Sequence, residues 1–193
     1  MERDNLFAAD DRIVLRKYSE KNKELFLELW EENFANSSVK DIVMQDANLT
    51  EKTWNDMFGA DRLSLTIYDK HCNAYVGEIT LRNLGDAEPE PGIQLLKRYQ
   101  GMGIGTRVMK LFLEELRNRN EIKSLFVRIA SDNIISQRMA TKFGAVPIGE
   151  EGKDKAELFE KIMLEMGKEK FEEIIPEGYE FTQKYIICYR IKI

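Results

Sequence analysis

The sequence predicts an α/β fold in which a mixed β-sheet is flanked by helices, in a single domain that spans residues 1–193. Three observations support this fold class. Segments that alternate apolar and polar residues, as at 63–68, are interleaved with segments of helical spacing, as at 104–116. The run at 124–130 is almost continuously apolar, which is typical of a central strand. A chain of 193 residues is also long enough to form one domain with a substantial core.

The composition is typical of a globular protein, with 43% hydrophobic and 33% charged residues. The 29 basic and 34 acidic side chains give a formal net charge of −5, which argues against nonspecific nucleic-acid binding. Cys72 and Cys188 lack the spacing of metal ligands, so we expect two reduced thiols and no metal site. The N-terminus does not resemble a signal peptide, and no apolar run approaches a membrane span. We therefore expect a cytoplasmic protein without a membrane or nucleic-acid partner.

Two helices are predicted near the N-terminus, after a first strand at 12–18 that lies near the sheet edge. Ser19 is the candidate cap of the first helix, and Thr50 is the candidate cap of the second. The apolar positions with helical spacing are Leu25, Phe26, Leu29, Trp30 and Phe34 in the first helix, and Trp54, Met57 and Phe58 in the second. We expect Trp30 and Trp54 to belong to the core or to a groove wall.

A pair of strands follows, at 63–68 and 74–84, joined by a turn that contains the only histidine, His71. A solvated turn residue is the favoured interpretation of His71, so a histidine-based triad or metal site has little support. The next strand, at 92–97, comes after a loop with three acidic residues, Asp86, Glu88 and Glu90.

The most informative stretch runs from Gln100 to Thr106, between that strand and a helix. The apolar face of the helix consists of Ile104, Val108, Leu111, Phe112 and Leu116. A strand that passes through alternating glycines into a helix leaves the backbone N–H groups of the first helical turn unpaired. The helix dipole adds partial positive charge there, so the turn is suited to bind a phosphate or pyrophosphate. A glycine-rich turn without a ligand is the alternative interpretation.

The C-terminal part contains a strand at 124–130, a helix that begins at Asp132-Asn133, a strand at 145–148 and a last strand at 185–191. A segment at 151–178 separates the last two strands, and its spacing predicts an additional helix. The helically spaced apolar residues of this segment are Ala156, Phe159, Ile162, Met163 and Met166.

Several short motifs identify a family when they are taken together with this order of elements. They are Gln100-x-x-Gly103-x-Gly105-Thr106, Asn133-x-x-Ser136, Lys142-Phe143-Gly144-Ala145 and Glu90-Pro91-Gly92-Ile93-Gln94-Leu95. The glycines do not fit the dinucleotide pattern G-x-G-x-x-G, and no G-K-[ST] of a P-loop follows them. The chain resembles the GNAT superfamily of acyl-CoA-dependent N-acyltransferases over essentially its whole length. The segment at 90–95 also resembles a strand of the branch that acetylates protein N-termini, polyamines and similar amines.

The resemblance implies the GNAT fold with a helical insertion at 151–178, and it implies acetyl-CoA as co-substrate without a metal. Backbone N–H groups of the glycine turn would bind the pyrophosphate, and the end of the preceding strand would hold the pantetheine arm and the acetyl carbonyl. The implied cofactor-binding residues are Leu95, Leu96, Lys97, Gln100, Gly101, Met102, Gly103, Ile104, Gly105, Thr106, Asn133 and Ser136. Asn133 is equally well explained as a helix N-cap, and Ser136 as a small residue that allows close packing.

The reaction that the resemblance implies is direct attack of an amine on the thioester, which needs a proton acceptor. Glu90 is the first candidate for this base and Glu78 the second, and for both an exposed structural charge is the alternative. The family often places a tyrosine seven residues after the motif asparagine, where this chain has Ala140, so the general acid stays open.

The acceptor would be a small-molecule or peptide amine, and the acidic loop and the negative net charge favour a cationic one. Monomer and homodimer are both compatible with the sequence. The helix at 151–178 either packs on the domain or covers the acceptor groove or a dimer interface. A non-catalytic acyl-CoA-binding or regulatory domain is the alternative function, because Ala140 departs from the family pattern. A nucleotide-binding protein is a distant third interpretation.

Overall fold

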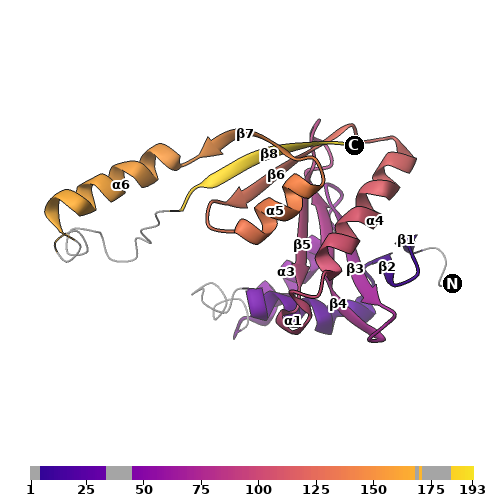
Figure 1. Cartoon of the computed structure of the whole chain (residues 1–193). Helices are drawn as coiled ribbons and strands as arrows, with labels where there is room; N and C mark the ends of the chain where they lie inside the picture. The colour runs from indigo at the N-terminus through magenta and orange to yellow at the C-terminus, as the bar shows by residue number, and fades with distance from the viewer. Residues whose placement is uncertain (1–4, 34–44, 168–169, 171–183) are drawn as a thin grey trace. The chain divides into compact units, whose positions relative to one another are not determined.

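The computed structural model describes residues 5–33, 45–167, 170 and 184–193. The chain forms two compact units, Met1–Leu125 with Ile193 and Phe126–Lys192. The first unit runs from indigo to pink in Figure 1, and the second is orange and yellow. The described part of the chain contains no helix that is long and apolar enough to cross a membrane.

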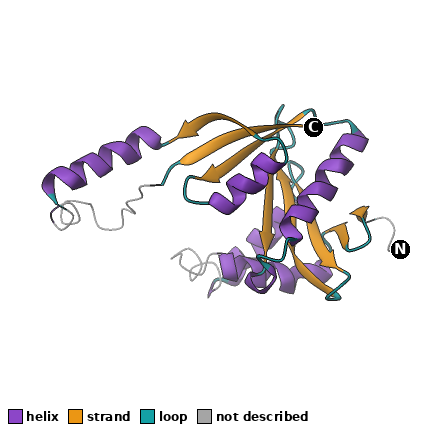
Figure 2. Cartoon of the chain, viewed as in Figure 1, coloured by secondary structure: helices purple, strands orange, loops and turns teal. Residues whose placement is uncertain are grey.

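The first unit is built on a five-stranded sheet with the order β1-β2-β3-β4-β5 (Figure 2). Its strands are β1 (Leu6–Ala9), β2 (Ile13–Lys17), β3 (Leu63–Asp69), β4 (Ala74–Arg82) and β5 (Glu90–Leu95), and each pairs antiparallel with its neighbour. The strand β1 was not predicted, because four residues are too few to show an alternation of apolar and polar side chains. The turn after β1 is fixed by Asp10, whose carboxylate accepts hydrogen bonds from the N–H groups of Arg12 and Ile13 at 2.8 and 2.6 Å.

The two faces of this sheet differ in chemistry. One face carries fully buried apolar side chains, which are Leu15, Leu65, Ile67, Ile79 and Leu81. On the other face the strand register aligns Arg16 with Thr66, Thr66 with Glu78, and Glu78 with Gln94. A row of polar residues therefore crosses four neighbouring strands through the middle of the sheet.

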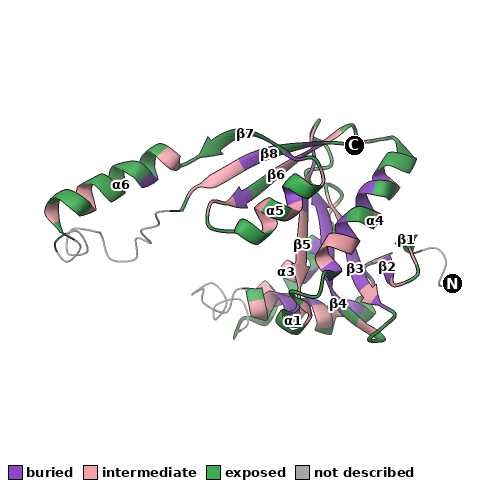
Figure 3. Ribbon diagram, viewed as in Figure 1, coloured by how far each residue is buried: buried purple, intermediate pink, exposed green. Residues whose placement is uncertain are grey.

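Short helices pack on the polar face. They are η1 (Glu20–Asn22), α1 (Lys23–Asn33), α3 (Ala47–Asn55) and η2 (Asp56–Phe58). Asn33 at the end of α1 donates a hydrogen bond to Gln94 of β5 at 2.8 Å. Trp54 is fully buried, as predicted, in a cluster with Tyr18, Phe26 and Met57, and Trp30 packs partly buried against it. Figure 3 shows long buried stretches on the sheet strands of the same unit. These helices thus cover polar sheet residues with an aromatic layer.

The caps of the two helices were predicted with mixed success. Ser19 does precede the first helical turn, and its N–H donates to the side chain of Asn22 at 3.0 Å. Thr50 was the wrong cap, because α3 begins earlier and Asp46 accepts from the N–H groups of residues 48 and 49. An aspartate at this position caps at least as well as a threonine, so composition alone could not separate the two. The predicted apolar residue Phe34 lies outside the described residues.

The strand before the glycine turn is displaced from its predicted range. The sequence predicted 92–97, whereas β5 covers Glu90–Leu95 and a 3-10 turn, η3 (Lys97–Tyr99), follows it. The turn closes when Tyr99 N–H donates to Leu96 O at 2.8 Å. The next helix, α4 (Ile104–Arg119), matches its predicted position and contacts β1, β2 and β5. Four of the five predicted apolar residues are buried, whereas Leu111 is half-buried, and Met109 and Leu113 complete the buried face.

The described part of the second unit contains a sheet with the order β6-β8-β7, together with the helices α5 and α6. Its elements are β6 (Ser124–Ala130), α5 (Ile134–Lys142), β7 (Val146–Glu151), α6 (Lys153–Met166) and β8 (Ile186–Lys192). The helix α6 lies within the segment predicted to be helical, and its N-cap is Gly152. The later part of that segment, at 171–178, lies outside the described residues. Its status as an insertion into the family fold stays a prediction.

Candidate active site

The glycine turn has a backbone conformation that side chains disfavour. Gly101 has a φ of 74° and Gly103 a φ of 73°, both in the left-handed region. A Cβ added to either glycine would have no heavy atom within 4 Å. The glycines are therefore required by the backbone angle rather than by crowding, and they leave open space directly over the turn.

The N–H groups of this turn are unpaired over six consecutive residues. Among the described residues, none accepts a hydrogen bond from the N–H groups of Gly101 through Thr106. Gly103 is the N-cap of α4 without a side-chain cap, and the first helical bond runs from Arg107 N–H to Gly103 O at 3.2 Å. Unpaired N–H groups at the positive end of a 16-residue helix make a site for an anion.

The side chains of Gln100 and Met102, at the start of this turn, have different environments. The Gln100 side chain donates from Nε2 to Leu95 O at 2.8 Å, which ties the turn to the end of β5. Met102 is 60% exposed and points its side chain into solvent. Gln100 therefore positions the turn, whereas Met102 contributes to the predicted site through its backbone.

The backbone groups at the end of β5 already have partners in the structure. Leu96 N–H donates to Val76 O at 3.0 Å. Lys97 N–H donates to Oε2 of Glu32, at the end of α1, at 2.7 Å. Glu32 was not predicted to lie near the site, because this contact joins positions 65 residues apart. For Lys97 N–H to hold an acetyl carbonyl, the Glu32 carboxylate has to move away.

Glu78 is a buried carboxylate in the middle of the polar row. The Tyr18 hydroxyl donates to its Oε2 at 2.8 Å, and both residues are less than a tenth exposed. Oε1 accepts no hydrogen bond from the described part of the chain. Burial raises the pKa of Glu78, against the opposing effects of the Tyr18 hydrogen bond and of the charges of Arg62 and Arg82. Glu78 is thus a carboxylate with one anchored oxygen and an increased affinity for a proton.

Tyr18 was not predicted to belong to the site. Burial, together with the charge of Glu78, raises the pKa of the Tyr18 phenol, so this group stays a hydrogen-bond donor. Its ring packs edge-on against Trp54, with centroids 5.8 Å apart. The aromatic cluster therefore fixes the hydroxyl that orients Glu78.

Glu90, the first candidate base, is engaged in an ion pair. Its Oε1 lies 2.8 Å from Nη2 of Arg82, its cross-strand neighbour. The Glu90 side chain is 13% exposed, and that of Arg82 is 46% exposed. A second residue of the acidic loop, Glu88, accepts a hydrogen bond from Ser124 at 2.6 Å. The expected acidic surface for a cationic acceptor is therefore partly used in internal contacts.

The predicted residues Asn133 and Ser136 belong to the second unit. Asn133 is the N-cap of α5, and its Oδ1 accepts from Ser136 N–H at 3.0 Å. The cap that the sequence allowed as an alternative is therefore real, and it leaves the Asn133 amide nitrogen as a donor. Ala140, at the position of the family tyrosine, is buried on the same helix.

Metal and thiol chemistry have no assembled site in the described part of the chain. No group of three or more His, Cys, Asp or Glu residues there could hold a metal ion. His71 is exposed in the turn between β3 and β4, as predicted, and its N–H donates to Asp69 at 2.8 Å. Cys72 is exposed, Cys188 is buried, and neither forms a disulfide.

Comparison with known proteins identifies the family. The model of the acetyltransferase (GNAT) domain matches residues 12–146, which is more than half of the chain. The chain therefore belongs to the GNAT acetyltransferase family and is an acyltransferase enzyme. No curated protein matches the sequence.

Solved structures of acetyltransferases share this fold. A RimL ribosomal L7/L12 alpha-N-protein acetyltransferase in complex with coenzyme A has a TM-score of 0.70 and 12% identity, over 97% of this chain and 98% of that one. A spermidine N-acetyltransferase SpeG chimera from Vibrio cholerae and hSSAT has a TM-score of 0.67 and 11% identity, over 93% and 95%. The microcin C7 self-immunity acetyltransferase MccE, in complex with acetyl-CoA and AMP, has a TM-score of 0.65 and 20% identity, over 95% and 94%.

Proposed function

We propose that the protein is an acetyl-CoA-dependent N-acetyltransferase that transfers an acetyl group to a primary amine. The observation that carries this proposal is the row of unpaired N–H groups from Gly101 to Thr106 at the start of α4. It supplies the donors and the open space that a pyrophosphate requires. Among GNAT relatives of the same fold, structures with coenzyme A or acetyl-CoA bound support this choice of co-substrate.

The chain's own groups fit the parts of acetyl-CoA. The glycine turn would hold the pyrophosphate, and the backbone of Leu95, Leu96 and Lys97 would run beside the pantetheine arm. The family resemblance also assigns Asn133 and Ser136 of the second unit to the cofactor, and the amide nitrogen of Asn133 is the donor that this residue would use. Acetyl-CoA supplies an activated acyl group as a thioester, so the protein needs only to position the amine and to manage protons.

Glu78 is the better-supported proton acceptor of the two predicted bases. Its raised pKa suits the removal of a proton from an ammonium group, and its Oε1 has no partner among the described residues. Tyr18 would hold the carboxylate in one orientation through Oε2. Glu90 is the second candidate, and its pairing with Arg82 favours a role in positioning.

The oxyanion of the reaction would be stabilised at the end of β5. Lys97 N–H is the donor with a displaceable partner, because Glu32 holds it through a flexible side chain. Leu96 N–H, by contrast, is part of a backbone bond to Val76. We therefore assign the acetyl carbonyl to Lys97 N–H, after Glu32 has moved.

The acceptor is proposed to be a small-molecule or peptide amine, in a cytoplasmic enzyme that is a monomer or a homodimer. Related folds include a protein N-terminal acetyltransferase and a spermidine acetyltransferase, which supports an amine but not one particular amine. The helix α6, whose Leu158 and Leu164 are exposed, keeps the two predicted roles, which are packing on the domain and covering the acceptor groove or a dimer interface.

The experiment that tests this function measures release of free coenzyme A from acetyl-CoA in the presence of a panel of amines. Mass spectrometry then identifies the acetylated product. Sustained amine-dependent release of coenzyme A, with one acetyl group on the product, is the expected result. Tight acetyl-CoA binding without turnover on any amine would instead favour the non-catalytic acyl-CoA-binding domain.

A further inference from the structure

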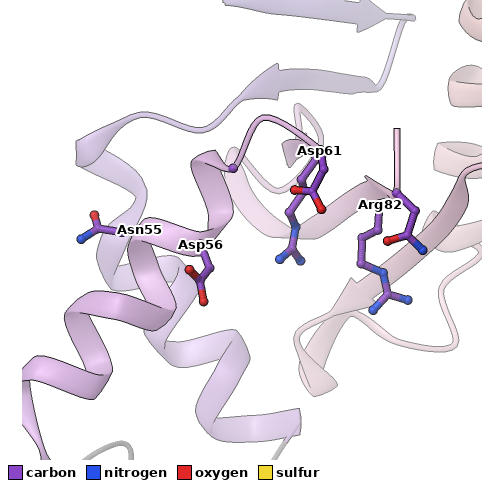
Figure 4. Close-up of a pocket in the computed structure, with 7 residues that line it drawn as sticks. Asn55, Asp56, Asp61 and Arg82 are labelled. Atoms are coloured by element: carbon purple, nitrogen blue, oxygen red, sulfur yellow. The ribbon is translucent and has the colours of Figure 1, made fainter. Parts of the chain in front are cut away.

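A polar pocket of about 370 Å³ opens in the first unit, at the end of the sheet where β4 meets the acidic loop (Figure 4). Its lining residues are Asn55, Asp56, Gly59, Asp61, Arg62, Arg82 and Asn83. Figure 4 shows Asp56 and Arg82 on opposite sides of this space, with Asn55 turned away from it. None of these residues was predicted from the sequence to belong to a functional site.

Arg62 is the unusual member of the pocket. Its Nε is buried and has no hydrogen-bond partner in the described part of the chain. A guanidinium N–H that is removed from water without an acceptor is unfavourable, so it is expected to find one in a ligand. Arg82, in contrast, already pairs with Glu90.

The charges of the pocket select among anions. A guanidinium binds a carboxylate or a phosphate through parallel hydrogen bonds. Asp56 and Asp61 are exposed residues that line the same space. Their negative charges oppose a doubly charged phosphate more strongly than a singly charged carboxylate. A carboxylate is therefore the better match.

The pocket lies within reach of the proposed base. Glu78 and Arg82 are four residues apart on β4 and so share one face of the sheet, about 13 Å apart along the strand. Both Arg82 and Arg62 act on the Glu78 carboxyl, since each lowers its pKa against the rise that burial causes. One extended ligand could place its amine at Glu78 and an acid in the pocket, because the arginine side chains bridge part of that length.

We propose that this pocket binds a carboxylate of the acceptor through Arg62, so that the enzyme prefers amines with a carboxylate several bonds from the reacting nitrogen, as in a short acidic peptide. The proposal rests on the proposed acetyltransferase function and names its substrate class. It replaces the expectation of a cationic acceptor, which was based on the net charge and on the acidic loop. Two acids of that loop have internal partners, because Glu90 pairs with Arg82 and Glu88 accepts a hydrogen bond from Ser124.

The test compares two acceptors that differ only in charge, alanyl-aspartyl amide and alanyl-asparaginyl amide, with spermidine as a cationic acceptor. For the wild type, kcat/KM is expected to be about 10–100-fold higher for the aspartyl peptide, the range of a charge-assisted hydrogen bond. Arg62→Gln should bring the ratio close to one, whereas Arg62→Lys should retain part of it. Arg98→Gln removes a guanidinium that pairs with Glu28 outside the pocket, and should leave the ratio unchanged.

Two outcomes would overturn the proposal. They are a wild-type preference for spermidine or for the neutral peptide, and a preference for the acid that survives in Arg62→Gln. Calorimetric binding of alanyl-aspartyl amide separates this failure from failure of the catalytic function. If the wild type binds the aspartyl peptide, Arg62→Gln does not, and no amine is turned over, the carboxylate site is supported and the enzyme activity is rejected. Thermal unfolding midpoints of the variants establish that each is folded.

Discussion

At the scale of one residue, burial of Glu78 has opposite effects on the stability of the fold and on the proposed proton transfer. Its pKa is raised in the folded chain by burial, so the folded state binds the proton more tightly than the unfolded state does. The stability from this group is fully present below the unfolded pKa and is lost as pH rises through the folded pKa. Above the folded pKa the charged carboxylate therefore destabilises the fold.

The first prediction concerns Glu78→Gln. The neutral amide still accepts from the Tyr18 hydroxyl but carries no charge into the core, so the unfolding midpoint at pH 8 should equal or exceed that of the wild type. Loss of the proton acceptor should lower kcat by about 10²–10⁴-fold. Thermal unfolding and coenzyme A release measure the two effects. A variant that retains full activity would transfer the base role to Glu90.

The second prediction concerns Tyr18→Phe. The hydrogen bond from Tyr18 lowers the pKa of Glu78 against the rise from burial, so its removal should raise that pKa further. Because the base acts when deprotonated, the acidic limb of kcat/KM against pH should shift to higher pH. A purely structural Tyr18 would lower activity equally at all pH values. Tyr99→Phe, outside the pair, is the matched control.

At the scale of elements, the pairing of β4 with β5 depends on one glycine. A Cβ at Gly77 would lie 2.1 Å from Gln94 O and 2.9 Å from the Cα of Leu95, both of them backbone atoms. Backbone atoms of these two paired strands cannot move apart without breaking the ladder that aligns Glu78 with Gln94. Gly77 is therefore needed for close approach of the strands.

The third prediction follows from this contact. Gly77→Ala should lower the free energy of unfolding by about 1–3 kcal/mol, the usual cost of overpacking. Gly85→Ala is the control, because its Cβ would have no heavy atom within 4 Å, and its effect should stay within about 0.5 kcal/mol. Urea unfolding measures both. Equal stability of the two variants would show that β5 can shift away from β4.

At the scale of the whole molecule, the sequence predicted what is local and periodic. The helix now seen as α4 was predicted from its apolar face, and the N-cap role of Asn133 from its position before a helix. The short motifs, taken together with the order of strands and helices, indicated the family, which the domain match confirms. These features depend on neighbours a few residues apart, so a single sequence contains them.

What the sequence could not predict depends on distant partners. Tyr18 and Glu78 are 60 residues apart, and only the strand register brings the hydroxyl to the carboxylate. The same holds for the contact between Glu32 and Lys97 N–H. Glu90 matched a family motif, yet the structure pairs it with Arg82 across β4 and β5. Motif position indicated where acids lie, whereas burial and partners decide which acid suits proton transfer.

The most direct test of the central claim is calorimetric titration of the wild type and Gly103→Asp with acetyl-CoA. Gly103 needs a positive φ and borders the unpaired N–H groups, so an aspartate there adds strain and negative charge where the pyrophosphate would bind. Gly85→Asp adds the same charge elsewhere and serves as the control. The account predicts that only Gly103→Asp weakens binding, by at least about 100-fold or ~2.7 kcal/mol. Equal binding by all three proteins would contradict a cofactor site at the glycine turn.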